Sequence, residues 1–160
     1  MFMSYLLRQC LAVTIISVIT ALALPGLAEA KVRSTPQERD AVKSLIRIEA
    51  LRIGVPVSLA LAVAHSESFF NPRAVSSAGA RGVMQIMPAT STGEYGINPN
   101  LLWVPRINIR IGLHFLKRLL KRYRGRAELA LSYYNGGSAV GDIPNARIIP
   151  ATASYVRKVL

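Results

Sequence analysis

The 160-residue sequence predicts one mainly α-helical domain with little or no β-structure. In most segments the apolar residues recur at intervals of three and four, which is the spacing of one face of an α-helix. Glycine, proline and asparagine separate these segments, and no stretch shows the clear alternation of apolar and polar residues that is typical of a half-buried strand. The length suits a single compact core.

Residues 1–30 have the features of a secretory signal peptide. Arg8 supplies a basic start, residues 10–24 are almost wholly apolar, and residues 28–30 (Ala-Glu-Ala) have the small-x-small form of a cleavage site. The apolar run is shorter than the ~20 residues of a membrane-spanning helix, so we expect cleavage after Ala30, with a retained membrane anchor as the alternative. Residues 31–160 would then form an exported domain, in the periplasm or elsewhere in the cell envelope.

Two helices are predicted at the start of this exported part. Thr35-Pro36-Gln37-Glu38 is a capping box with proline in the first turn, and Gly54 marks the end of the first helix. Pro56 begins the second helix, which is apolar almost all round as far as Ala64. A helix of that kind belongs in a protein core.

Loops and further helices follow. Residues 71–82 form a loop rich in Asn, Pro, Ser and Gly, short helical turns are expected on both sides of Pro88, and residues 93–99 form another loop. Longer helical patterns cover residues 105–123, 127–135 and 150–160.

The composition restricts the chemistry that this domain can carry out. Its formal net charge is +12, from 20 basic and eight acidic residues. The single cysteine, Cys10, lies in the expected signal peptide, which leaves residues 31–160 without a disulfide, a thiol nucleophile or a cysteine-ligated metal. His65 and His114 lie on separate predicted helices without ligand-like neighbours, so we expect no metal site.

Seven carboxylates remain in residues 31–160, and Glu67 differs from the other six. Glu67 ends the apolar helix, and no basic residue precedes it there. Desolvation and the negative end of the helix dipole should both raise its pKa, which suits a general acid, whereas a solvent-facing glutamate is the alternative. The other six have structural explanations: a cap (Glu38), basic neighbours on the same helix (Asp40, Glu49), a helix first turn (Glu128) and glycine-containing loops (Glu94, Asp142).

Four segments, in order along the chain, resemble the motifs of one enzyme family. They are residues 64–72 with a Glu-Ser pair, 79–90 with Met-Gln, 133–137 with Tyr-Asn, and 149–156 with Pro-x-Thr-x-x-Tyr-Val. The family is that of the lytic transglycosylases with a soluble-type catalytic domain. The resemblance implies a lysozyme-like helical fold over nearly all of residues 31–160.

The resemblance also implies roles for individual residues. It makes Glu67 the single catalytic acid, and it assigns substrate contacts to five others: Ser76, Gln85, Met87, Tyr134 and Asn135. Tyr134 and Asn135 correspond to a pair that faces the glutamate. Tyr133 and Gly136 depart from the family's usual alanines, which concerns the shape of the groove more than catalysis.

The activity that the resemblance implies is cleavage of peptidoglycan glycan strands without water as the acceptor. Glu67 would protonate the oxygen of the β-1,4 bond between N-acetylmuramic acid and N-acetylglucosamine. It would then take the proton of the muramic acid 6-hydroxyl, which closes a 1,6-anhydro ring. Tyr134 would orient Glu67 or stabilise the developing positive charge. No metal or organic cofactor is needed.

Two other functions are compatible with the sequence. One is a hydrolytic muramidase that uses a second carboxylate, for which Glu94 is a candidate. The other is a non-catalytic cationic domain that binds anionic envelope polymers or a membrane surface through the basic cluster, six Lys and Arg residues within 117–126; a solvated helix face is the alternative. Export and the lack of a basic-aromatic pattern argue against nucleic acid. General wall turnover and a role beside a secretion apparatus fit the sequence equally.

Overall fold

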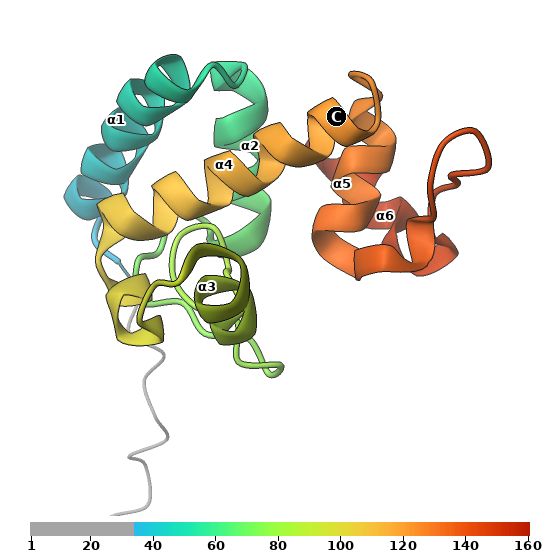
Figure 1. Ribbon diagram of the computed structural model, residues 1–160. Coiled ribbons are helices and arrows are strands. Elements are labelled where there is room, and N and C mark those ends of the chain that lie inside the picture. The colour runs from blue at the N-terminus through green and yellow to red at the C-terminus, as the bar shows by residue number, and fades with distance from the viewer. Residues whose placement is uncertain (1–33) are drawn as a thin grey trace, which may run out of the picture. The chain divides into compact units, whose positions relative to one another are not determined.

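The structure of the protein is a computed structural model that describes residues 34–160 (Figure 1). The prediction of a signal peptide over residues 1–30 falls outside the described residues. Within residues 34–160, none of the helices combines the length and the hydropathy that crossing a bilayer requires.

Helices account for most of the described chain. They are α1 (Pro36–Ile53), α2 (Val57–Ser68), α3 (Pro88–Tyr95), α4 (Pro105–Arg122), α5 (Ala127–Gly136) and α6 (Ala153–Val159), with short 3-10 helices at Pro99–Trp103, Gly137–Val140 and Pro150–Thr152. In place of a sheet, the described residues contain two isolated bridges, which join Val75 to Arg81 and Arg81 to Ile86. The mainly α prediction is confirmed.

Local sequence signals set the two ends of α1. The Thr35 side chain accepts a hydrogen bond from the Glu38 backbone N–H at 3.1 Å, and Glu38 Oε2 accepts one from the Thr35 N–H at 2.8 Å. The predicted capping box is therefore present. Gly54 follows the last turn with a left-handed φ of 78°, a conformation that glycine adopts without steric cost and that commonly ends a helix.

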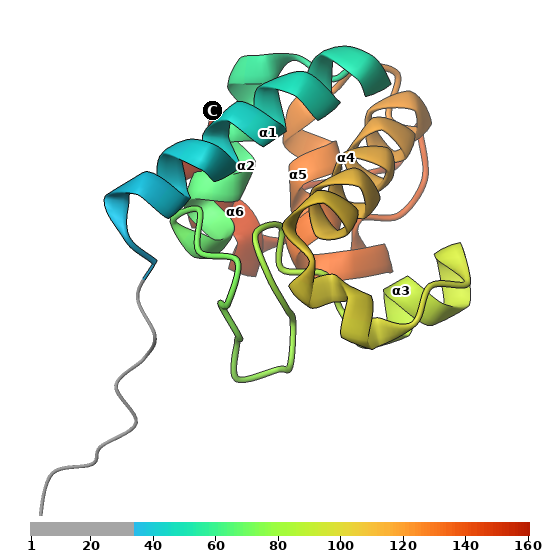
Figure 2. The ribbon, with the colours of Figure 1, turned by 90° about the vertical axis from the view of Figure 1, so that its left-hand side faces the viewer.

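The chain between α2 and α4 departs from the prediction in two respects. Residues 82–85 form a turn rather than helix, and α3 begins at Pro88 and continues through Gly93 and Glu94, where a loop was expected. The reason is that proline is favoured in the first turn of a helix, so Pro88 starts a helix instead of separating two short ones. Figure 2 shows the preceding segment as a hairpin-like excursion between α2 and α3.

The packing of the helices brings the end of α2 beside α6. Helix α4 contacts α1 on one side and α5 on the other, and α6 contacts both α2 and α5 (Figures 1 and 2). The core between them is apolar and includes the wholly buried side chains of Ile46, Met84, Leu102, Ile109, Leu113, Leu116 and Leu131. This arrangement places Glu67 of α2 where α6 can reach it.

Asn108 of α4 is a buried polar residue that holds the turn before α3. Its Oδ1 accepts a hydrogen bond from the Met84 N–H at 2.7 Å, and its Nδ2 donates to the carbonyls of Arg81 at 2.8 Å and Leu102 at 3.1 Å. One turn later, α4 approaches so closely that a Cβ on Gly112 would lie 2.5 Å from Met84 Cβ. The turn therefore rests directly on α4.

The predicted environment of Glu49 is wrong. The prediction paired it with basic residues of its own helix, but its side chain is wholly buried and faces α4. Arg106 Nε and Arg110 Nε each lie 2.9 Å from one of its carboxylate oxygens. A buried carboxylate needs such partners because desolvation of an unpaired charge is costly. By contrast, Asp40 binds Lys43 of its own helix at 2.9 Å, as predicted.

Candidate active site

Glu67 lies one residue before the end of α2 and accepts a hydrogen bond from α6. The hydroxyl of Tyr155 donates to Glu67 Oε1 at 2.6 Å. Burial raises the pKa of the Glu67 carboxyl above its ordinary value of 4.5, and the Tyr155 hydrogen bond and the charge of Lys158 only partly oppose that rise. A raised pKa keeps more of the carboxyl protonated toward neutral pH, which is the state that a general acid requires.

Tyr155 remains a proton donor to this carboxyl. Burial, followed by the negative charge of Glu67, raises the pKa of the Tyr155 hydroxyl well above its usual range. Tyr155 is not among the site residues predicted from the sequence, although it lies in the fourth of the segments that resemble the family. Only the packing of α6 on α2 brings it to Glu67, 88 residues earlier.

Most of the other carboxylates in the described chain bind a cation instead. The pairs are Glu38 with Arg73, Asp40 with Lys43, Glu49 with Arg106 and Arg110, Glu94 with Arg118, and Asp142 with Arg122. Glu128 lies in the first turn of α5, as predicted. Of the seven, Glu67 is distinguished by a raised pKa together with a neutral hydrogen-bond donor.

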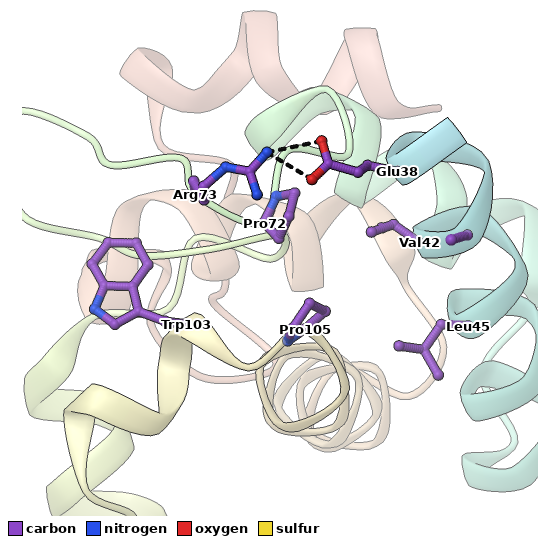
Figure 3. A pocket seen from close by; sticks show the side chains of 8 residues that line it. Glu38, Val42, Leu45, Pro72, Arg73, Trp103 and Pro105 are labelled. Atoms are coloured by element: carbon purple, nitrogen blue, oxygen red, sulfur yellow. Dashed lines mark hydrogen bonds and ion pairs between the residues drawn. The ribbon is translucent and has the colours of Figure 1, made fainter. Parts of the chain in front are cut away.

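A cavity of about 360 Å³ beside Glu38 illustrates the difference (Figure 3). Arg73 Nη2 lies 2.8 Å from both carboxylate oxygens of Glu38. The Thr35 backbone N–H and Arg73 hold the pKa of Glu38 below its ordinary value. A carboxylate kept in its charged form has no proton to give to a leaving group. The other residues of this cavity are largely apolar: Ala41, Val42, Leu45, Pro72, Trp103 and Pro105.

A separate cavity of about 310 Å³ brings together most of the predicted substrate-binding residues. Gln85, Met87, Tyr134 and Asn135 line it, together with Ile86, Thr90, Glu94, Phe115, Tyr133 and Gly137. Ser76 is not among the lining residues; its Oγ accepts a hydrogen bond from the Ala80 N–H at 3.0 Å within the preceding loop.

Glu67 does not line this cavity either, but its charge acts on a residue that does. Burial raises the pKa of Tyr134 well above its ordinary value, and the negative charge of Glu67 contributes to the rise. The Tyr134 hydroxyl itself donates to the Met84 carbonyl at 2.8 Å. The orienting contact with Glu67 that the resemblance suggested for Tyr134 is therefore made by Tyr155.

The turn that carries Gln85 is held from three helices. Ser68 of α2 donates to the Val83 carbonyl at 2.7 Å, Tyr134 of α5 binds the Met84 carbonyl, and Asn108 of α4 binds the Met84 N–H. Gln85 itself has a left-handed φ of 46°, and its Nε2 donates to the carbonyls of Gly82 and, at 3.1 Å, Ala74. Its amide oxygen accepts no hydrogen bond from the described residues.

Half of the basic cluster is engaged by the domain itself. Arg118 binds Glu94, Arg122 binds Asp142, and Lys117 donates to a backbone carbonyl at the end of α1. Glu94, the candidate second carboxylate, lines the cavity with Gln85 and Asn135, and its carboxylate is bound to Arg118. The described residues hold no group of three or more His, Cys, Asp or Glu side chains that could bind a metal ion.

The domain that carries these residues matches a known protein family. Residues 44–143 match the family described as Transglycosylase SLT domain. The chain belongs to this family. The predicted relationship is confirmed.

Individual SLT relatives are similar over part of their length. The chain is 34% identical over 90 residues to the soluble lytic murein transglycosylase of Escherichia coli (strain K12), which covers 52% of this chain and 14% of that protein. It is 36% identical over 109 residues to the membrane-bound lytic murein transglycosylase C of Edwardsiella ictaluri, which covers 59% of this chain and 30% of that protein. The chain thus spans less than a third of these relatives.

Solved structures share the SLT fold. One is the lytic transglycosylase Slt of Pseudomonas aeruginosa, an inactive glutamate-to-glutamine mutant, with a TM-score of 0.62 and 28% identity over 73% of this chain and 22% of that one. Another is the 70 kDa soluble lytic transglycosylase of Escherichia coli, with a TM-score of 0.62 and 28% identity over 72% and 22%. The predicted fold class is confirmed.

Proposed function

We propose that this domain is a peptidoglycan lytic transglycosylase that cleaves the β-1,4 bond between N-acetylmuramic acid and N-acetylglucosamine and leaves a 1,6-anhydromuramic acid end. The observation that carries the proposal is the buried Glu67 carboxyl, with its raised pKa and its neutral partner Tyr155. The names of the SLT relatives, all lytic murein transglycosylases, support the substrate class.

In the proposed reaction Glu67 acts twice. Tyr155 occupies Oε1, so Oε2 carries the proton that passes to the bridging oxygen as the bond to the anomeric carbon breaks. The resulting carboxylate then takes the proton of the muramic acid 6-hydroxyl, whose oxygen bonds to the anomeric carbon. Glu67 ends protonated, and no water is consumed.

The cavity beside α5 is the proposed position of the sugars next to the cleaved bond. The Gln85 amide oxygen and the exposed Asn135 amide would bind acetamido or hydroxyl groups, and Met87, which is 40% exposed, would pack against the glycan. Tyr134 would stabilise positive charge that develops at the anomeric carbon. By the family resemblance, Ser76 would contact the sugars from the neighbouring loop.

A hydrolytic muramidase is the alternative on the same substrate. Ordinary glycosidases use two carboxylates, about 5–5.5 Å apart when retaining and about 6.5–9.5 Å apart when inverting. Glu94 is the acid that lines the cavity, but its carboxylate binds Arg118, and a nucleophile or base would have to leave that ion pair. The single-acid reaction needs no such rearrangement.

We also propose that the domain acts in the cell envelope, after export and removal of residues 1–30. Peptidoglycan glycan strands are its proposed partner, and anionic envelope polymers are a further candidate through Lys121, Arg124 and Arg126, the members of the basic cluster that are exposed and whose side chains make neither an ion pair nor a hydrogen bond within the described chain. Of these three, only Lys121 lies on α4, which ends at Arg122; Arg124 and Arg126 lie between α4 and α5.

Digestion of purified sacculi with mass spectrometry of the products tests the proposal. Anhydromuramic products are one water lighter than hydrolysis products, so a reducing muramic acid end would identify a muramidase instead. Glu67→Gln should abolish cleavage but leave the fold and sacculus binding intact, and Glu94→Gln is the matched control that should stay active. Full activity of Glu67→Gln would refute the assignment, and an inactive wild type that binds sacculi would indicate the non-catalytic domain.

A further inference from the structure

A third hollow lies between the end of α1 and the middle of α4, two helices that pack side by side (Figure 1). Its volume is about 440 Å³, and its lining residues are Glu49, Arg52, Ile53, Arg110, His114 and Lys117. None of these residues lines the cavity with Gln85 and Asn135. We call this hollow the α1–α4 depression.

Positive charge dominates the α1–α4 depression. Its one acid, Glu49, is wholly buried, and both of its carboxylate oxygens accept hydrogen bonds from arginines, one from Arg106 and one from Arg110. The negative charge is therefore already compensated. Arg52 and Lys117 add two further cations at the surface, and the exposed His114 adds an imidazole between the two helices.

Several hydrogen-bond donors around the depression are not used by the domain. Arg110 bonds Glu49 through Nε, and its two terminal nitrogens make no hydrogen bond within the described chain. The side chains of Arg52 and His114 make none with residues 34–160. Lys117 gives one of its three N–H groups to the Ile53 carbonyl. The unused donors come from both helices.

The helical spacing explains why these donors meet. Arg110, His114 and Lys117 are four and then three residues apart, which places them on one face of α4. Arg52 comes from the last turn of α1, where the neighbouring Ile53 carbonyl accepts a hydrogen bond from Lys117 of α4. A guanidinium binds oxyanions through two parallel N–H groups and an ammonium binds them as a point charge, so the set suits an anion with several oxygens.

We infer that the α1–α4 depression binds a phosphate group, as a phosphate monoester or diester. One large apolar side chain of α1, Ile48, lies one helical turn before Arg52 and is 57% exposed. An apolar side chain next to a cationic site is the combination that binds the headgroup region of an anionic lipid. A phospholipid and a soluble phosphate ester are the two sources of this ligand.

Titrations of the full chain by NMR test the site, with ionic strength held constant. Inorganic phosphate should shift the amide signals of Arg52 and His114 saturably. Arg52→Glu should weaken this binding at least about tenfold, because it removes a charged hydrogen-bond donor and adds repulsion. Lys121→Glu, the same charge reversal one turn beyond Lys117, should weaken it by less than about twofold. Equal weakening by both variants, or no saturation, would show general attraction to a basic protein and overturn the site.

The ligand's source is tested with short-chain lipids below their micelle concentration. Dihexanoyl phosphatidylglycerol that binds more tightly than inorganic phosphate, with the gain lost in Ile48→Ser, would identify the lipid as the source. Equal binding of the two would support the phosphate site and identify a soluble ester. If dihexanoyl phosphatidylcholine bound as tightly as phosphatidylglycerol and Arg52→Glu had no effect on either, the inference would be wrong. Arg52→Gln, which removes one positive charge without adding a negative one, serves if Arg52→Glu fails to fold, and it should also weaken phosphate binding.

Discussion

The hydroxyl of Tyr155 lies 2.6 Å from Oε1 of Glu67, so that the last helix of the domain contacts the candidate acid directly. Burial raises the pKa of Glu67, and its partner brings no positive charge, whereas the Thr35 N–H and Arg73 lower the pKa of Glu38 and Arg110 lowers that of Glu49. Burial beside a neutral hydroxyl suits Glu67 to exchange a proton, whereas Glu38 and Glu49 form ion pairs that stabilise the fold.

Removal of the Tyr155 hydroxyl should move the pH dependence of glycan cleavage. Its hydrogen bond lowers the pKa of Glu67, so Tyr155→Phe raises that pKa further. The general acid must be protonated, and the basic limb of kcat/KM against pH should move to higher pH, while the rate itself falls about 10- to 100-fold through lost orientation. Tyr134→Phe, whose hydroxyl binds Met84, should lose activity without moving that limb. An unmoved limb in Tyr155→Phe would contradict this role.

Glu67→Gln should make the domain more stable at neutral pH. The folded-state pKa of Glu67 is raised, so the folded chain holds this proton more tightly than the unfolded chain does. The free energy of unfolding of the wild type therefore falls as pH rises from 4.5 through the raised pKa, and glutamine does not titrate. Urea unfolding should show an advantage for Glu67→Gln at pH 7 that disappears below pH 4.5.

Glu38→Gln should have the opposite effect to Glu67→Gln on the free energy of unfolding measured with urea. The pKa of Glu38 is lowered, so its contribution to stability is present above 4.5 and is lost as pH falls through the lowered pKa. Glu38→Gln should be less stable than the wild type at pH 7. If both variants changed stability in the same direction at pH 7, the assigned pKa shifts would be wrong.

Loss of the two arginines should destabilise the fold more than loss of the buried Glu49 to which they bind. Loss of both arginines in Arg106→Gln/Arg110→Gln leaves a buried carboxylate unpaired, which should cost about 3 kcal/mol, at the low end of such effects because the arginine side chains are 56% and 38% exposed. Glu49→Gln leaves cations that water can reach, and it should cost about 1 kcal/mol. Chemical denaturation measures both, and equal costs would contradict the asymmetry.

Gly112→Ala should disturb the active-site turn through Met84. The added Cβ would meet Met84 Cβ at 2.5 Å and Cγ at 2.7 Å, so the turn or α4 must shift, at about 1–3 kcal/mol. Cleavage should fall as well, because the turn carries Gln85. Gly93→Ala in α3 meets nothing within 4 Å and should be neutral or stabilising by up to about 1 kcal/mol. A neutral Gly112→Ala would show that the turn is not held tightly.

The features that were predictable from the sequence are those that depend on nearby residues. The capping box of Thr35 and Glu38 and the stop at Gly54 act within one helical turn, so the ends of α1 follow from local signals. Glu67 was found as a candidate because its own helix supplies the apolar surroundings that raise its pKa.

The features that were missed depend on helices distant in the sequence. Glu49 and Arg110 are 61 residues apart, and Glu67 and Tyr155 are 88 apart. Neither local spacing nor charge pattern indicates that α4 buries Glu49 or that α6 delivers a hydroxyl to Glu67. These contacts appear only when the helices are packed together.

Asn108 limits how far the candidate active site could be transplanted. If residues 74–87 were grafted onto another helical scaffold, the loop would lose the Asn108 side chain. That amide binds the loop backbone at Arg81 and Met84. The loop would keep its own hydrogen bonds and isolated bridges, but it would lose the contacts that fix it to the helices. Because Ser68 of α2 and Tyr134 of α5 bind the same turn, the smallest portable unit is the loop together with α2, α4 and α5, and a matching asparagine is one feature that a recipient scaffold would need.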